Sequence, residues 1–160
     1  MKISILLPYK ENFSINKAGA VSLYVRDITS KSKFKNEIKI YGETKDKRKL
    51  LKGFVHLDIK KKIYLSKTNA YINEFVNKER KNNSDLIEIH NRPSYVGFIK
   101  RNLNSKIIIY FHNDPLSMKG SISIEDRKSL LNNCEKIIFN SQWCKSRFSR
   151  NLNDIDLSKK

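Results

Sequence analysis

The sequence is poor in the residues and runs that mark several classes of protein. Its two cysteines, Cys134 and Cys144, lack the C-x-x-C spacing of redox and zinc motifs. No cluster of histidine and cysteine suggests zinc, so we expect two partly buried thiols in a reduced cytosolic protein and no bound metal. No apolar run is long enough to span a bilayer. The first eight residues are too short for a signal-peptide core and lack a small-residue cleavage site, so they predict a first strand.

Acidic residues are also few beside the basic ones. The 160 residues include 33 Lys and Arg against 16 Asp and Glu, which gives a net charge of +17. Such an excess attracts nucleic acid, anionic lipid headgroups or phosphorylated glycans, although solvated turns and an AT-rich genome would also produce many lysines. The signatures of RNA- and DNA-binding modules are missing, so nucleic acid is not the expected partner. A membrane surface or an anionic substrate is the better prediction.

The most informative stretch is 106–120, KIIIYFHNDPLSMKG. Its unbroken apolar run predicts a strand covered on both faces, as in a parallel sheet flanked by helices. The strand must end at His112-Asn113-Asp114-Pro115, because proline lacks an N–H and biases the preceding residue away from helix. The loop that follows therefore carries an imidazole, an amide and a carboxylate. In open α/β sheets ligands bind beyond the carboxyl ends of the strands, which is where this loop would lie.

The rest of the chain alternates between expected strands and expected helices. Strands are expected at 2–7, 36–41, 54–59, 85–89, 107–111 and 135–140, and helices at 18–28, 64–81, 94–102, 123–133 and 141–148. The alternation predicts an α/β, Rossmann-like three-layer domain over residues 1–150, with a mostly parallel sheet of about six or seven strands. Residues 151–160 are expected to form a polar tail or the start of a linker.

Polar or small residues follow four of the expected strands. After the first comes Ala18-Gly19-Ala20, where small residues would let a phosphate approach the free N–H groups of a helix; the alternative is a tight turn that packs helix on strand. The other loops carry His90-Asn91-Arg92, His112-Asn113-Asp114 and Asn140-Ser141. Because the carboxyl ends of parallel strands lie at one edge of a sheet, this convergence predicts a binding site.

Five segments resemble, in order, the N-terminal domain of a GT-B glycosyltransferase of the retaining family 4, in the bacterial branch that builds lipopolysaccharide and other surface glycans. They are LLPYKENFS, KAGAVSLYVRDI, IEIHNRP, FHNDPLSMKG and FNSQWCKSRF. HNRP followed by HNDP-x-x-M-x-G is the specific part. The resemblance implies a hexosyltransferase with a nucleotide-sugar donor, a glycan or glycolipid acceptor, no cofactor and no metal. It also implies a cytoplasmic protein, peripheral on the inner face of the cytoplasmic membrane.

The resemblance also assigns roles to individual residues. His112 is expected to be the catalytic histidine that hydrogen-bonds the transferring group. The expected donor and phosphate-binding residues are Ala18, Gly19, Ala20 and Ser141, and the expected acceptor-binding residues are His90, Asn91, Arg92, Asn113 and Asp114. Ala18 stands where many members of the family have a first glycine.

Several of these residues have a structural interpretation as well. His112 could cap its strand or bond its own loop, and Arg92 could pair with Glu88 or Asp114. Asp114 precedes a proline and is best explained as a turn residue, and Ser141 as a helix N-cap.

The second domain of the family, which holds most donor contacts and a glutamate pair separated by seven residues, has no counterpart in these 160 residues. We therefore expect the chain alone to be inactive or nearly so, as a truncated product, an excised domain or half of a split enzyme. The alternative function is a non-enzymatic Rossmann-like module that binds an anionic partner, either a membrane surface or nucleic acid.

Overall fold

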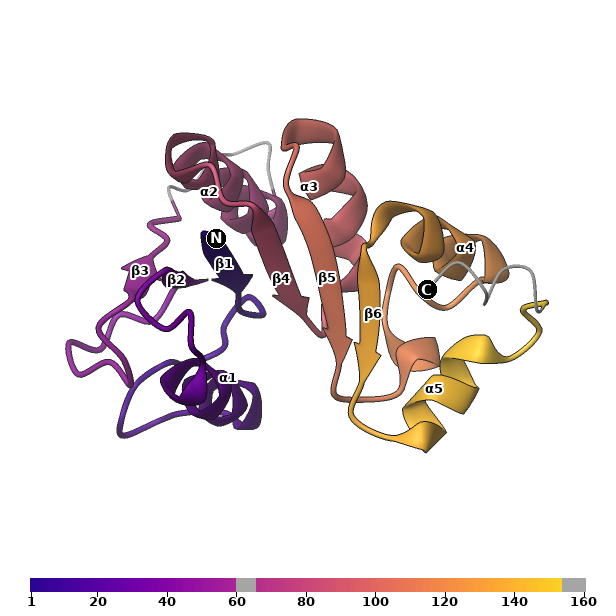
Figure 1. Ribbon diagram of the computed structural model, residues 1–160, viewed down its shortest axis with the longest axis horizontal. Coiled ribbons are helices and arrows are strands. Elements are labelled where there is room, and N and C mark those ends of the chain that lie inside the picture. The colour runs from indigo at the N-terminus through magenta and orange to yellow at the C-terminus, as the bar shows by residue number, and fades with distance from the viewer. Residues whose placement is uncertain (60–65, 154–160) are drawn as a thin grey trace. The chain divides into compact units, whose positions relative to one another are not determined.

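The computed structural model describes residues 1–59 and 66–153 and has the predicted α/β architecture (Figure 1). Its strands are ordered β3-β2-β1-β4-β5-β6 in one sheet, and the registers of β1 with β2, β2 with β3 and β5 with β6 are parallel. The predicted Rossmann-like fold with six or seven strands is thereby confirmed. The chain forms two compact units, Met1–Leu86 and Ile87–Lys160.

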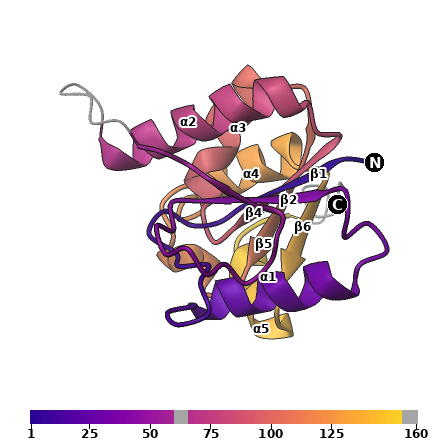
Figure 2. The same cartoon turned by 90° about the vertical axis from the view of Figure 1, so that its left-hand side faces the viewer.

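The described part of the first unit contains three parallel strands and two helices. Its elements are β1 (Ile3–Leu6), α1 (Ala20–Lys31), β2 (Ile38–Gly42), β3 (Phe54–His56) and α2 (Lys67–Asn82). Figure 2 shows α1 and α2 on opposite sides of β1 and β2. The strand expected at 54–59 ends at His56, because β3 is the edge strand and pairs with β2 over three residues. Tyr64 and Leu65, assigned to the second helix, lie outside the described residues.

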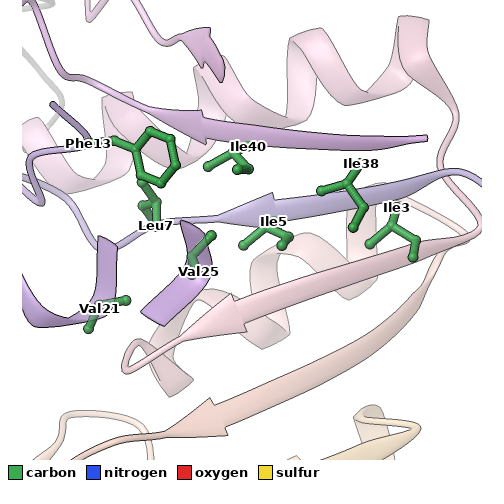
Figure 3. Close-up of a cluster of buried hydrophobic side chains, with 8 residues drawn as sticks. All are labelled: Ile3, Ile5, Leu7, Phe13, Val21, Val25, Ile38 and Ile40. Atoms are coloured by element: carbon green, nitrogen blue, oxygen red, sulfur yellow. The ribbon is translucent and has the colours of Figure 1, made fainter. Parts of the chain in front are cut away.

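Apolar side chains from β1, β2, α1 and the segment between β1 and α1 form the core of the first unit (Figure 3). The buried cluster comprises Ile3, Ile5, Leu7, Phe13, Val21, Val25, Ile38 and Ile40. Val21 and Val25 lie one turn apart on α1, as the helical spacing predicts. Each fully buried side chain of this kind contributes roughly 1.5–3 kcal/mol, so the cluster accounts for the packing of α1 on the two strands.

A buried carboxylate ties the end of α2 to β1. Glu79 is 1% exposed and accepts hydrogen bonds from the Ser4 hydroxyl at 2.6 Å and from the Ser84 N–H at 2.8 Å. Burial, and then the nearby Glu79, raise the pKa of Tyr41 to about 12. Because a buried charge is costly unless it is hydrogen-bonded, these contacts hold the last turn of α2 in one position.

The second unit continues the alternation. Its elements are β4 (Leu86–His90, whose first residue belongs to the first unit), α3 (Val96–Asn102), β5 (Lys106–Phe111), α4 (Ile124–Asn133), β6 (Lys136–Phe139) and α5 (Gln142–Ser149). Short 3-10 turns at Pro93–Tyr95 and Pro115–Ser117 follow the ends of β4 and β5. Figure 2 shows α3 and α4 on one side of β5 and β6, and α5 on the other.

Two further expectations concern the cysteines and the length of the helices. Cys134 and Cys144 are free, and at 1% and 2% exposure they are buried more completely than expected. In the described parts of the chain, no helix combines the length and the apolar character needed to cross a membrane.

Candidate functional site

Asn91 ties the ends of two neighbouring strands together in the second unit. It follows β4 with a φ of 51°, a left-handed conformation that asparagine adopts more readily than most residues. Its N–H donates to the Tyr110 carbonyl at 2.9 Å, and its Oδ1 accepts the His112 N–H at 2.7 Å. Asn91 is 5% exposed. It therefore holds the beginning of the His112 loop against the end of β4.

Asn140 holds the same loop from the other side. Its Nδ2 donates to the His112 carbonyl at 2.7 Å, and its N–H donates to the Phe111 carbonyl at 3.2 Å. The arrowheads of β4, β5 and β6 point the same way in Figure 1, so the three loops gather at one edge of this unit. The convergence predicted for His90–Arg92, His112–Asp114 and Asn140 is thus present, with His112 between two asparagines.

A carboxylate and two imidazoles lie in a row on the same strands. His90 Nε2 is 2.7 Å from Glu88 Oε1, and His90 Nδ1 is 2.8 Å from His112 Nε2. Alternation places Glu88 and His90 on one face of β4, and Tyr110 and His112 on one face of β5. The Tyr110 ring stacks on the His112 ring with centroids 4.6 Å apart. His90 is fully buried, so its contact with the site is through His112.

The surroundings of His112 keep its ring neutral at physiological pH. Burial, followed by the neighbouring His90, lowers the pKa of His112 to about 4, and Glu88 opposes this shift. A neutral imidazole presents one N–H donor and one lone-pair acceptor. His112 can therefore form hydrogen bonds of either sense with a polar ligand.

Arg92 forms neither of the two ion pairs considered for it. Its Nη1 donates to the Asn91 carbonyl at 2.8 Å. Glu88 contacts His90, and Asp114 contacts Arg147, so among the described residues neither carboxylate pairs with Arg92. A half-buried guanidinium without a carboxylate partner in this part of the chain is suited to an anionic ligand.

Asp114 anchors its loop to α5 and caps the 3-10 turn. Its Oδ2 accepts from Arg147 Nη2 at 2.9 Å, and its Oδ1 accepts the Leu116 N–H at 3.0 Å. The hydrogen bonds from Arg147 lower the pKa of the Asp114 carboxyl. The Asn113 carbonyl accepts from Cys144 Sγ at 3.6 Å. The interpretation of Asp114 as a turn residue is confirmed.

Ser141 is the N-cap of α5, as interpreted from the sequence. Its side chain accepts the Cys144 N–H at 3.2 Å, which satisfies one of the free donors of the helix. The residue is exposed.

The predicted phosphate-binding turn, Ala18-Gly19-Ala20, lies in the first unit. α1 begins at Ala20 rather than Ala18, because Gly19 has an extended backbone and serves as the N-cap. The Glu11 carboxylate accepts the Ser22 N–H at 3.1 Å, and a Cβ on Gly19 would collide with this carboxylate. The sequence pattern does not point to Glu11. Its carboxylate already satisfies one donor of the helix end to which a donor phosphate was assigned.

The chain was compared with known proteins. No family model matches it, and no curated protein matches it. Sucrose-phosphate synthase from Thermosynechococcus elongatus matches it with a TM-score of 0.68 at 11% identity, over 96% of this chain and 46% of the synthase. A shorter structure of that synthase gives 0.61 at 12% identity, over 96% and 84% of the two chains. The chain therefore shares the α/β fold of that part of the synthase. It spans less than half the length of the first synthase structure.

The sequence alone does not indicate two residues that lie against the imidazoles, Glu88 and Tyr110, as members of the site. The sequence suggests Glu88 only as a possible partner of Arg92, and Tyr110 only as part of an apolar strand. The spacing in Leu86-Ile87-Glu88-Ile89-His90 contains a usable signal, since residues two apart on a strand share a face. For Tyr110 the same rule applies relative to His112.

Proposed function

We propose that this chain is the N-terminal, acceptor-binding half of a glycosyltransferase. The enzyme would transfer a hexosyl group from a nucleotide-sugar to a lipopolysaccharide-type or other surface glycan. One observation carries the proposal: His112 lies at the carboxyl end of β5, held by Asn91 and Asn140, in a GT-B-like fold. Ligands of open α/β sheets bind at this edge, and the HNRP and HNDP motifs of family 4 coincide with these loops.

In this proposal the charge of a side chain determines which group of the substrates it binds. Neutral His112 hydrogen-bonds the transferring sugar, and the Arg92 guanidinium binds an anionic group of the acceptor. Asn91, Asn113 and Asp114 shape the acceptor loops, and the proposal assigns donor binding to Ser141 and to the Ala18–Ala20 turn. A second domain would supply most donor contacts and exclude water. The resemblance to family 4 implies neither a metal nor a cofactor.

The test is transfer by the chain joined to a second α/β domain encoded in, or beside, the same reading frame. Release of nucleoside diphosphate from a panel of nucleotide-sugars is measured with truncated lipopolysaccharide as acceptor. His112→Ala is expected to lower kcat by about 100-fold or more. His56→Ala, the same change at an exposed histidine, should leave kcat unaltered. Turnover that survives in His112→Ala, or no turnover with any donor, contradicts the proposal.

A second candidate is a non-enzymatic module that binds an anionic partner, and the net charge of +17 favours it. The same charge suits a transferase that is cytoplasmic and peripheral on an anionic membrane, because each exposed Lys or Arg near such a surface contributes about 1 kcal/mol. Partner selectivity separates the two candidates. A transferase half should prefer anionic lipid, whereas a general anion-binding module should bind any polyanion.

A further inference from the structure

A pocket of about 620 Å³ lies in the first unit, between α2 and the strands β2 and β3. Ile38 and Ile40 face the buried core to which α1 contributes. Alternation therefore turns Lys39 and Tyr41 toward the other face of β2, where α2 lies (Figure 2). Val55, which pairs with Tyr41 in register, lines the same pocket. Its volume is within the range of small-molecule sites, roughly 300–1,000 Å³, and none of its lining residues was assigned to donor or acceptor binding.

The lining of this pocket is strongly basic. Of its nine residues, four are lysines and one is a glutamate, which leaves three net positive charges; they are Lys2, Lys39, Lys78, Lys81 and Glu74. The Glu74 carboxylate is 3.5 Å from Lys78 Nζ and offsets that charge. In the part of the chain that the structure describes, the other three lysines form no ion pair with a carboxylate. The excess of basic residues seen in the sequence is thus gathered in a concave place.

Two of these lysines meet at Asn82, the last residue of α2. Lys39 Nζ donates to Asn82 Oδ1 at 2.6 Å, and Lys2 Nζ donates to the Asn82 carbonyl at 3.4 Å. The amide is held from its other side, because Nδ2 donates to the Ser84 hydroxyl at 2.7 Å and lies 3.5 Å from the Glu79 carboxylate, which only accepts. Its Oδ1 therefore faces Lys39. Two ammonium groups from different strands are gathered around one neutral residue.

The negative groups near the pocket are engaged elsewhere or are too weak to neutralise it. The carboxyl end of α2 carries a partial charge of about −0.5, which suits Lys2 and Lys81 but is less than the charge of one lysine. The Glu79 carboxylate is 1% exposed and is occupied by the hydroxyl and N–H groups that surround it. Asp85 accepts the backbone N–H of Lys2 at 2.8 Å and pairs with none of the ammonium groups of the pocket. An anion with two or more charges would therefore complement this lining.

We propose that this pocket binds a small soluble ligand with a phosphate or diphosphate group, held by the ammonium groups of Lys2, Lys39 and Lys81. Lysine binds phosphate as a point charge, and hydrogen bonds between the two are charge-assisted. A phosphate dianion matches three ammonium groups better than a carboxylate does. The Tyr41 ring and Val55 offer an apolar surface to the rest of the ligand.

Inorganic pyrophosphate is the probe, and its binding to the full chain is followed in ¹H–¹⁵N correlation spectra. At about 150 mM salt, general attraction to the basic surface is screened. Signals of the residues that line the pocket are expected to shift and to saturate. In Lys39→Gln/Lys81→Gln the dissociation constant should rise at least about tenfold. The control Lys31→Gln/Lys35→Gln removes the same charge from exposed lysines outside the pocket and should change it less than about twofold.

Two outcomes of this titration would overturn the proposal. Shifts that do not saturate, or equal weakening in the two double variants, would mean an adventitious ion only. Glu74→Gln gives a test of opposite sign that remains if Lys39→Gln/Lys81→Gln does not fold. It removes the carboxylate beside Lys78 and should tighten pyrophosphate binding about threefold, whereas Glu37→Gln, at an exposed residue outside the pocket, should not. Unaltered affinity in Glu74→Gln would contradict the proposal.

Vesicles rich in phosphatidylserine distinguish a soluble phosphate compound from a lipid headgroup. The two double variants should lose vesicle binding equally, because that attraction follows the net charge. Greater loss in Lys39→Gln/Lys81→Gln, with pyrophosphate affinity unaltered, would assign the pocket to the membrane surface and overturn the proposal. None of these measurements needs a nucleotide-sugar. Absence of transfer activity would therefore contradict the proposed function alone, and absence of pyrophosphate binding would contradict this site alone.

Discussion

At the scale of single residues, His112 should make the stability of the fold depend on pH. Its pKa of about 4 in the folded chain lies below the ordinary value of 6.5, so the unfolded chain binds more protons between these two pH values. The free energy of unfolding should therefore fall as the pH drops from about 6.5 to 4. In His112→Gln this part of the fall disappears. Urea unfolding at several pH values, with His56→Gln as control, measures it; identical pH profiles for wild type and His112→Gln would contradict it.

Two glycines should respond to alanine in opposite directions. Gly97 lies in α3, where an added Cβ would be 3.5 Å from Arg101 Nη1, an ordinary contact. Gly97→Ala should therefore stabilise the fold by about 0.5–1 kcal/mol. Gly19→Ala should destabilise it by about 1 kcal/mol, because the new Cβ displaces the Glu11 carboxylate from the end of α1.

Urea unfolding of both glycine variants checks the signs. Adding Glu11→Ala to Gly19→Ala should cost less than the sum of the two single changes, since both remove the same contact. Additive losses would mean that Gly19→Ala acts independently of Glu11.

At the scale of elements, Arg127 connects two helices of the second unit. It lies on α4, is 3% exposed, and its Nη1 donates to the Phe148 and Arg150 carbonyls at the end of α5, at 2.5 and 2.6 Å. Arg127→Met removes both bonds and leaves these acceptors without their donor. The expected loss is about 2–4 kcal/mol of unfolding free energy.

The matched control for Arg127→Met is Arg150→Met, which removes the same charge from an exposed side chain and should alter stability by less than about 0.5 kcal/mol. Equal effects of the two substitutions in urea unfolding would show that charge, and not the contact between helices, determines the loss.

Elements whose signals are local were predictable from the sequence. The helix expected from residue 123 begins there, with Ser123 and Asp126 forming a capping box, and Pro115 follows the end of β5 as expected. α1 starts two residues later than the predicted start at Ala18, because Gly19 is an extended N-cap and Glu11 accepts the Ser22 N–H, a contact that leaves no trace in the local pattern.

At the scale of the whole molecule, the net charge of +17 predicts which lipid surfaces the chain binds. It should bind vesicles rich in phosphatidylserine and leave those of phosphatidylcholine alone, with binding that weakens between about 50 and 200 mM salt. Sedimentation with vesicles measures this, with duplex DNA of equal charge concentration as competitor. Equal binding to both polyanions at every salt concentration would favour the general anion-binding module.

The sequence by itself determined the order of strands and helices and the polar loops at the strand ends. It also indicated His112 as a candidate catalytic residue. These features rest on periodicity, proline and capping, which act over a few neighbouring residues. Tertiary structure decided which charges meet: Glu88 with His90, Asp114 with Arg147, and Glu11 with the start of α1. Such pairs join residues separated by up to 33 positions. The local sequence around a carboxylate does not indicate which distant residue folding brings next to it.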